Sequence, residues 1–374
     1  MINTIDRIID LAVRIQQIAA PTFHEGARAE FVRRMFEEEG LSDVAMDETG
    51  NVYGKFQVSG SRSQGKPLII SAHLDTVFPF EMDLSVRREE GRLYGIGIGD
   101  NSVGVAALFG VMWMLQQQRF DYANAPLSAR GDIWFVANTC EEGLGDLRGM
   151  KAVVERFGSD VQAYLVLEGM ALGHVYHKAV GVKRYRVTAR TQGGHSWSDY
   201  GQPSAVLELS RLIVQLTALS LPRKPRTTLN VGRVNGGTSV NTIPAEAWME
   251  LDLRSEGQAE LAELVEGVEK LIEAAHKPEV RFEAEAIGAR PAGELSPKHP
   301  LVKLAQACLR EQGLETTLTS GSTDANIPLS MGYPALVLGV TKGGGAHTRN
   351  EFIEIEPVAK GMEQLVRFVG GMWE

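Results

Sequence analysis

The chain has 374 residues, more than one hydrophobic core usually serves, so we expect two domains. Its composition is ordinary for a globular protein, and its formal net charge of −9 argues against a nucleic-acid partner, because phosphate binding requires a basic surface. No apolar run approaches the ~20 residues of a membrane span, and the first residues lack the pattern of a signal peptide. Two distant cysteines, Cys140 and Cys308, favour a reduced compartment. These features predict a cytoplasmic protein without a membrane partner.

Helices and apolar strands alternate in the first part of the chain. Residues 4–19 have helical periodicity, and a second helix is predicted up to Gly40, with Thr22 and Glu25 spaced as a capping box. Residues 102–116 are apolar on nearly all sides, which predicts a helix buried against a sheet. Short apolar runs, typical of strands in a mostly parallel sheet, occupy residues 68–72, 133–136 and 163–167.

Each of these apolar runs is followed by a histidine or by carboxylates. Side chains alternate along a strand, so His73 and Asp75 point the same way. In open parallel sheets, ligands bind at the carboxyl ends of the strands. The sequence therefore predicts a metal site built from residues that follow three strands and a glycine-rich turn: His73, Asp75, Asp100, Glu141, Glu142 and Glu168. Without metal, five acids would crowd into one cleft and repel one another.

The sequence pattern changes near residue 180. Alternating apolar and charged residues there indicate half-exposed antiparallel strands, and the predicted order is βαββαβ, the ferredoxin-like unit. We expect an α/β catalytic domain formed by residues 1–178 and 290–374, with an α+β lid or dimerisation domain inserted at residues 179–289. An exposed edge of the inserted sheet could pair two copies of the chain.

The ordered set of motifs resembles a known family over nearly the whole chain. That family is the di-zinc exopeptidases and amidohydrolases, which include peptidase T, carboxypeptidase G, aminoacylases and succinyl-diaminopimelate desuccinylase. The motifs that carry the resemblance are His73-Leu74-Asp75, Gly99-Asp100, Glu141-Glu142, the strand-end Glu168, Gly193-Gly194-His195-Ser196 and His347. Any one of these motifs is weak by itself, whereas their order along the chain is specific.

The resemblance implies two divalent metal ions, most simply zinc, with cobalt or manganese as alternatives. One ion would be held by His73, Asp100 and Glu168, and the other by Asp100, Glu142 and His347, so that Asp100 bridges them. The family often has aspartate where this chain has Glu168, but some acylase-like members carry glutamate there. This difference leaves the ligand role in place.

Two further roles in the catalytic domain follow from the resemblance. Asp75 would orient the ring of His73 and fix its tautomer. Glu141 would be the general base that takes a proton from the attacking water and returns it to the leaving amine. Cys140, next to Glu141, lacks a histidine partner in its motif and is interpreted as a small buried hydrophobic residue.

Three residues of the inserted domain also match family positions. His195 resembles the histidine that stabilises the oxyanion, often in the partner subunit's site, although an ordinary turn histidine is the alternative. Asn241 and Arg254 resemble substrate-binding positions, and an arginine suits a substrate carboxylate. Arg254 could instead form a surface ion pair with Asp252 on the same strand face. The loop from Gly321 to Asp324 resembles the family's substrate-side loop, without an assigned role.

The sequence thus predicts a metal-dependent hydrolase of amide bonds. An exopeptidase acting on short peptides or C-terminal residues is the first hypothesis, and a deacylase or desuccinylase of N-acyl amino acids is the second. Arg254 is compatible with both, because both substrates carry a free carboxylate. A third hypothesis, a binding protein that has kept the fold without the chemistry, is disfavoured by the intact set of ligands and by Glu141. A homodimer formed through the inserted domain is expected.

Overall fold

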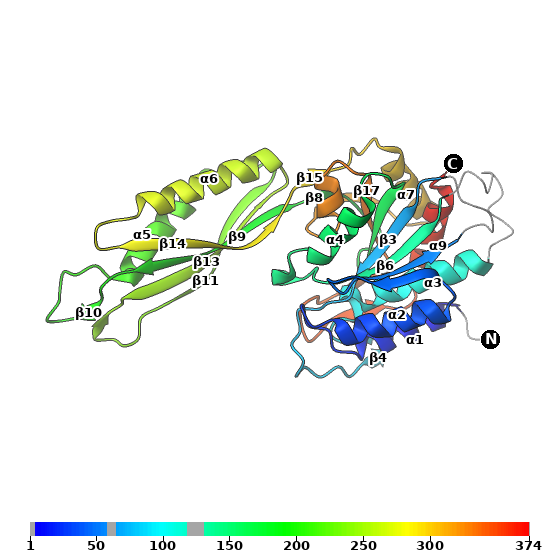
Figure 1. Cartoon of the computed structure of the whole chain (residues 1–374), viewed down its shortest axis with the longest axis horizontal. Helices are drawn as coiled ribbons and strands as arrows, with labels where there is room; N and C mark the ends of the chain where they lie inside the picture. The colour runs from blue at the N-terminus through cyan, green and yellow to red at the C-terminus, as the bar shows by residue number, and fades with distance from the viewer. Residues whose placement is uncertain (1–3, 58–64, 118–130, 374) are drawn as a thin grey trace. The chain divides into compact units, whose positions relative to one another are not determined.

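The computed structural model describes residues 4–57, 65–117 and 131–373. Residues 1–3, which belong to the segment predicted to lack a signal-peptide pattern, lie outside these ranges. The chain forms two compact units, one made of Met1–Ala179 and Glu294–Glu374 and the other of Val180–Gly293 (Figure 1). Each unit has its own hydrophobic core.

A mixed sheet, with nine strands among the described residues, forms the centre of the first unit. Its order is β1-β2-β6-β3-β7-β17-β8-β15, with β16 pairing with β8. Pairing is parallel from β6 through β3 and β7 to β17, and antiparallel between β1, β2 and β6. The strands are β1 (Ser42–Met46), β2 (Val52–Phe56), β3 (Leu68–His73), β6 (Ile133–Asn138), β7 (Ala163–Glu168), β8 (His174–Ala179), β15 (Gly293–Glu294), β16 (Thr317–Gly321) and β17 (Ala335–Gly339).

Helices cover both faces of this sheet, so the α/β class predicted from the sequence is confirmed. Strand β3 shows the division, because Leu68 and Ile70 pack into one core while Ile69 packs into the other. The first core includes α1 (Thr4–Gln16), α2 (Gly26–Glu38), α3 (Val103–Gln117), α7 (Pro300–Glu311) and α9 (Val358–Gly371). The second core includes α4 (Arg148–Phe157) and α8 (Asn326–Ser330). Burial on both faces explains why these strands are apolar throughout.

Helix α3 and the turn before it form a longer apolar segment than was predicted from the sequence. The segment Ile98–Gln117 is long and apolar enough to cross a membrane by length and composition, with a mean hydropathy of 1.4. However, 83% of that window is buried within the fold, where α3 packs on α1, α9 and β3. Its composition is therefore explained by its position in the core, although the prediction that no run reaches this length was wrong.

A small sheet lies beside the glycine-rich turn at residues 95–99. It consists of β18 (Gly343–Gly344), β19 (Phe352–Glu354), β5 (Arg92–Tyr94) and β4 (Arg87–Glu89), in that order. Phe352 pairs with Tyr94, which brings the segment after His347 alongside the segment that leads to Asp100. Two stretches about 250 residues apart in sequence are thereby held together.

The second unit has the βαββαβ order predicted for it. Its sheet order is β11-β13-β9-β14, all antiparallel, with the two helices packed into a single core. The elements are β9 (Gly181–Arg190), α5 (Ala205–Thr217), β11 (Thr227–Gly236), β13 (Glu246–Ser255), α6 (Gln258–Ala274) and β14 (Arg281–Arg290). A short extra pair, β10 (Gly194–His195) with β12 (Thr242–Ile243), carries the predicted site histidine.

The predicted capping box of the second helix is absent. Helix α2 begins after Glu25, whose side chain makes no capping hydrogen bond. The Thr22 hydroxyl donates instead to the Asp75 carboxylate at 3.0 Å. The Glu25 carboxylate accepts a hydrogen bond from the Cys140 N–H at 3.0 Å. Partners more than 50 residues away have replaced the Thr22–Glu25 pair that the spacing suggested, although the Glu25 carboxylate also accepts from the nearby Phe23 N–H at 3.1 Å.

The hairpin of β1 and β2 is held by Asp47 and is connected to the end of β6. The Asp47 carboxylate accepts hydrogen bonds from the backbone and side chains of Thr49 and Asn51 and from the Tyr53 hydroxyl. The Asn51 side-chain oxygen in turn accepts from the Thr139 N–H at 3.0 Å, just before Cys140. Partial burial opposes ionisation, but the hydrogen bonds from Thr49, Tyr53 and Asn51 outweigh it and lower the pKa of Asp47.

We predict that Asp47→Asn destabilises the protein in a pH-dependent way. Because the folded pKa lies below the unfolded one, the stabilisation is complete above the unfolded pKa and is lost as the pH falls through the folded value. The substitution should lower the free energy of unfolding by about 1–2 kcal/mol at pH 7 and by progressively less below about pH 4. Urea unfolding at several pH values, with the exposed neighbour Glu48→Gln as control, measures this. An effect that does not change with pH would contradict the prediction.

Candidate metal centre

Three neighbouring strands bring the first ligands to one edge of the sheet. Strand β3 pairs in parallel with β6 on one side and with β7 on the other. His73 is the last residue of β3 and Glu168 the last of β7, while Glu141 and Glu142 follow β6 after a short turn. Parallel strands end at the same edge, so these side chains converge there.

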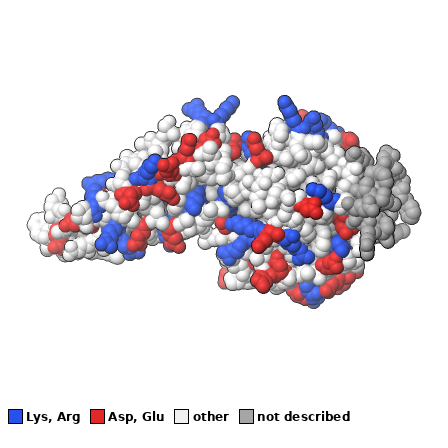
Figure 2. All heavy atoms as spheres, turned by 45° about the horizontal axis from the view of Figure 1, so that its top comes forward, with Lys and Arg blue, Asp and Glu red and all other residues white. Residues whose placement is uncertain are grey.

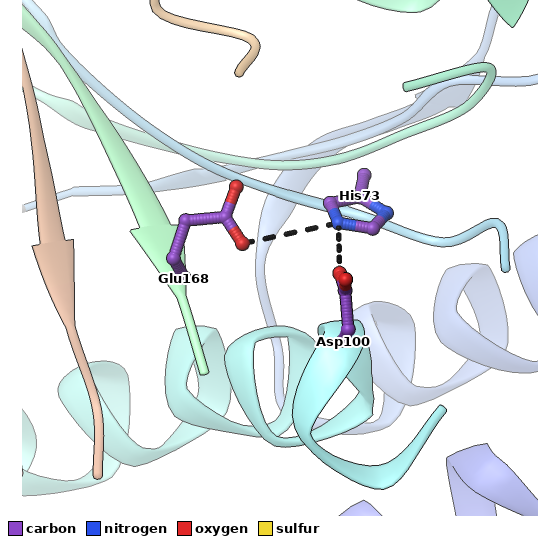
Figure 3. Close-up of side chains that lie close together, drawn as sticks. All are labelled: His73, Asp100 and Glu168. Carbon is purple, nitrogen blue, oxygen red and sulfur yellow. Dashed lines mark hydrogen bonds and ion pairs between the residues drawn. The ribbon is translucent and has the colours of Figure 1, made fainter. Parts of the chain in front are cut away.

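The first ligand group joins His73, Asp100 and Glu168 (Figure 3). His73 Nε2 lies 3.0 Å from Asp100 Oδ1 and 3.9 Å from Glu168 Oε2. The ring of His73 is 1% exposed, and both carboxylates are less than one-fifth exposed. Asp100 comes from the turn before α3, where the chain approaches from the side of the small sheet.

The second ligand group joins Asp100, Glu142 and His347. His347 Nε2 lies 3.0 Å from Asp100 Oδ2 and 2.9 Å from Glu142 Oε1. Asp100 therefore presents one carboxylate oxygen to each histidine, and the two groups share this residue. This is the arrangement expected of a carboxylate that bridges two cations.

Glu141 is in neither of these groups, but with His73 and Glu142 it forms a third set of possible ligand atoms. One of its carboxylate oxygens is within 4.8 Å of ligand atoms of His73 and Glu142. The side chain is 6% exposed, and its backbone N–H donates to Asp75 Oδ1 at 2.9 Å. Glu141 and Glu142 are thus adjacent in the chain, but only Glu142 contacts His347.

The donor atoms fit divalent cations. Zinc is bound by imidazole nitrogen and carboxylate oxygen at about 2.0–2.2 Å, which separates neighbouring donors by about 3.3–3.6 Å in a tetrahedral site. The observed separations, from 2.9 to 3.9 Å, bracket that value. Imidazole and carboxylate ligands also suit cobalt and manganese.

The protonation of these groups shows how strongly they interact. Burial opposes a charge on His73, but its hydrogen bonds to Asp100 and Asp75 raise the pKa of the ring well above its usual range. The hydrogen bond with Asp100, supported by that with Glu142, raises the pKa of His347 to about 10. Burial raises the pKa of Glu168, and the nearby carboxylates Asp100, Glu141 and Asp324 raise it further. The protons on His73 and His347 therefore lie between the candidate ligand atoms, at the positions that cations would occupy.

Asp75 supports the site from behind His73. Its Oδ1 lies 3.5 Å from His73 Nδ1, on the opposite side of the ring from the ligand group. Its two oxygens also accept the backbone N–H groups of Glu141 and Glu142, each at 2.9 Å. The hydrogen bond to the His73 ring involves the main chain of Asp75, whose carbonyl oxygen lies 3.1 Å from Nδ1. Asp75 therefore orients the ring mainly through its backbone, and its carboxylate holds the turn that carries Glu141 and Glu142.

Arg28 provides a buried positive charge that the sequence analysis did not identify. It is 2% exposed and donates to the carbonyl oxygens of Ile18 and Leu74 at 2.9 and 2.7 Å. Burial lowers the pKa of Arg28 to about 10, while the charges of Asp75 and Glu25 act against that shift. The side chain therefore stays cationic at neutral pH and partly offsets the two buried acids.

Four more polar residues lie around the site, and none of them had a role assigned from the sequence. Asn101 connects Asp100 to the end of β7, because its side chain donates to Leu167 O and accepts from Gly169 N–H. Asn138 donates to Asp324 Oδ2 at 2.7 Å, so the 321–324 loop places a buried carboxylate near Glu168. The fourth residue, Glu351, accepts three backbone N–H groups, and burial raises its pKa to about 7. Their partners are distant in sequence, so no local motif marks them.

The remaining predicted residues lie in the second unit. His195 and Asn241 are neighbours, because the Ser196 N–H donates to Asn241 O at 3.0 Å and β10 pairs with β12. Arg254 makes the ion pair with Asp252 that the sequence offered as an alternative, at 2.9 Å. Its side chain remains 43% exposed.

Comparisons with known proteins agree with this fold. Succinyl-diaminopimelate desuccinylase from Corynebacterium glutamicum is 25% identical over 94% of this chain and 92% of that protein. The crystal structure of a tripeptidase from Staphylococcus aureus superposes with a TM-score of 0.82 and 22% identity over 100% of this chain and 99% of that one. A Bacillus subtilis protein described as a dinuclear metal binding peptidase from the M20 family has a TM-score of 0.69 at 16% identity, over 98% of both chains.

The fold is an α/β sheet with helices on both faces, and two candidate ligand groups that share Asp100 lie at the carboxyl edge of its parallel strands. Residues 69–370 match the model of Peptidase family M20/M25/M40, and the chain belongs to that family. The resemblance inferred from the motifs is thereby confirmed. Family membership indicates metal-dependent hydrolysis of an amide bond.

We predict that the metal-free protein binds two zinc ions and that ligand variants lose them in a set pattern. His347→Ala should leave one site, because the group of His73, Asp100 and Glu168 stays intact. Asp100→Ala should weaken both sites, because both groups share that carboxylate. Isothermal titration of zinc into the chelator-treated protein measures the stoichiometry, with the exposed His276→Ala as a matched control. Two sites of undiminished affinity in His347→Ala would exclude His347 as a ligand.

Proposed function

We propose that this protein is a di-metal exopeptidase that hydrolyses the amide bond of short peptides, with zinc as the native metal. One observation carries the proposal: each oxygen of Asp100 lies 3.0 Å from the Nε2 atom of a different histidine, and the Glu141 carboxylate lies beside both groups. Two cations next to a general base are the requirements for attack of water on an amide.

The residues of the site have separate tasks. When bound, the two metal ions supply Lewis-acid polarisation of the amide carbonyl and lower the pKa of a water molecule. Glu141 takes the proton from that water and delivers it to the leaving amine. Asp75 keeps Nδ1 of His73 occupied, so that Nε2 faces the ligand group, and holds the backbone of Glu141 in place.

His195 is proposed to donate a hydrogen bond to the developing oxyanion. Its Nδ1 accepts the backbone N–H groups of Trp197 and Ser198 at 3.2 and 3.4 Å. In the neutral ring the proton then lies on Nε2, which is the donor that oxyanion stabilisation requires. The His195 N–H is itself fixed by the Asp199 carboxylate at 2.7 Å, so the turn is well ordered before substrate arrives.

Deacylation of an N-acyl amino acid is the second candidate. The observation that favours it is the 25% identity with a succinyl-diaminopimelate desuccinylase over most of both chains. Arg254 is proposed to bind the substrate carboxylate in either reaction, with Asn241 as a further substrate contact. In the structure Arg254 is engaged by Asp252, so substrate would have to compete with that ion pair.

A homodimer through the inserted unit is proposed as the working form. Strand β11 is an edge of its sheet and exposes Val234 by 57%, and helix α5 exposes Val214 by 68%. An open edge with apolar side chains beside it suits pairing with a second copy.

Acidic and basic side chains are interspersed over the face shown in Figure 2, which is consistent with a small-molecule substrate rather than nucleic acid. A cytoplasmic location is proposed because both cysteines are free.

We predict turnover of amides that depends on metal and favours peptides. Chelator-treated protein, reloaded with zinc, cobalt or manganese, would be tested on dipeptides, tripeptides and N-acetyl and N-succinyl amino acids. Peptides should give the highest kcat/KM, and chelation should abolish activity. Faster turnover of N-acyl amino acids would favour the deacylase, and no turnover of any amide would favour a binding function.

The Glu141→Gln variant separates the roles of the two adjacent glutamates. Loss of a general base should lower kcat by about 10²–10⁴-fold while two metal ions remain bound. The matched variant Glu142→Gln should lose affinity for one ion. Loss of metal from Glu141→Gln, with full occupancy in Glu142→Gln, would show that the two roles are exchanged.

The proposed dimer predicts a concentration-dependent mass. Sedimentation equilibrium should give twice the chain mass for the natural protein and a monomer for Val214→Glu, because a buried charge at an apolar contact is costly. The exposed position Glu263→Gln on α6 serves as a control. A natural protein that remains monomeric at micromolar concentration would reject the dimer.

A further inference from the structure

Glu351 is a fully buried acid that belongs to neither ligand group. Its side chain is 0% exposed, and it lies four residues after His347, directly before β19. A buried carboxylate is costly unless its oxygens are hydrogen-bonded. Its partners therefore indicate what the residue is for.

All three of its side-chain partners are backbone N–H groups of the turn that carries Asp100. Oε2 accepts from Gly97 at 3.0 Å, and Oε1 accepts from Gly99 at 2.8 Å and from Asp100 itself at 2.9 Å. These groups lie in the turn before α3, and Asp100 there has a non-helical backbone with φ of −120° and ψ of 84°. A carboxylate from the far end of the chain thus satisfies the turn that holds the shared ligand.

The backbone of Glu351 strengthens the same connection. The Gly95 N–H donates to Glu351 O at 3.0 Å, and the adjacent pair Phe352 and Tyr94 continues the contact as β19 and β5. On the other side, the Glu351 N–H donates to Thr348 O at 3.3 Å, which closes the short turn after His347. Glu351 is therefore hydrogen-bonded to both the Asp100 turn and the His347 turn.

The two ligand groups depend on this connection to different extents. His73 and Glu168 end strands β3 and β7 and are positioned by the sheet. In the second group, Asp100 and His347 both lie on turns, and the hydrogen bonds of Glu351, next to the pairing of β19 with β5, connect these two turns directly. Movement of the Asp100 turn would disturb both groups, but the second would lose the relative position of two of its three ligands.

The glycine-rich turn that carries Asp100 depends on contacts from outside the turn. Gly97 has a φ of 70°, which favours glycine, and a Cβ at Gly99 would lie 2.5 Å from Met170 Sδ, so the Met170 side chain would have to move. A glycine-rich segment is conformationally permissive and needs external hydrogen bonds to hold one geometry. Glu351 provides three of them.

We propose that Glu351 is a positioning residue that sets the geometry of the second metal site by holding the Asp100 turn against the His347 turn. This inference deepens the proposed di-metal function and rests on it. It assigns no contact between Glu351 and metal or substrate. Its role is exerted through Asp100 and His347.

The test is titration of zinc into chelator-treated Glu351→Gln, which has the same shape but places an NH2 group against one backbone N–H. One of the two sites should weaken by about 10–100-fold, the usual cost of losing a group that orients a ligand. The other site should change by less than about threefold. Glu354→Gln, three residues along on β19, is the matched control and should bind as the natural protein does.

A second variant and a second measurement keep structural damage apart from positioning. Glu351→Asp retains the charge and both oxygens, so it should restore part of the lost affinity, and it decides the question if Glu351→Gln does not fold. Thermal unfolding of the metal-free variants measures stability alone. Equal weakening of both sites in proportion to lost stability would overturn the proposal, as would unchanged binding in both variants while the natural protein binds two ions. A natural protein that binds no zinc would overturn the proposed function, and this inference with it.

Discussion

Repulsion among buried carboxylates at one edge of the sheet is the constraint on which the rest of this structure depends. Asp75, Asp100, Glu141 and Glu142 lie close to His73, and Glu168 completes the cluster from the neighbouring strand. Such a concentration of negative charge in a low-dielectric region is unstable by itself. The two divalent cations that we propose would offset it, because Asp100 is shared by both candidate ligand groups.

Hydrogen bonds and one buried arginine within the protein stabilise part of this negative charge. Backbone N–H groups donate to Asp75, Glu25 and Glu351, and the guanidinium of Arg28 lies among the acids behind the site. These interactions are fixed by the fold and do not depend on occupancy. They hold the ligand-bearing turns together, which is the preorganisation that the proposed metal binding would require.

The positions of particular residues show where the sequence predicted the structure correctly and where it did not. His73 and Glu168 could be placed because strand ends of a parallel sheet converge, and because an apolar run marks a strand from local residues alone. Thr22 and Glu25 have the spacing of a capping box, yet their side chains bind Asp75 and Cys140. A local pattern states only what a side chain could bind, whereas tertiary contacts decide which partner is closer.

The sequence by itself determined the α/β class of the first unit, the βαββαβ order of the second and the residue types able to hold metal, because periodicity and strand-end chemistry are local properties. Only the tertiary structure decided that Asp100 faces His73 with one oxygen and His347 with the other. It also revealed that Arg28 and Glu351 stand behind the ligands. Those relations join segments up to 254 residues apart, and the distance between such segments is set by packing of the whole fold.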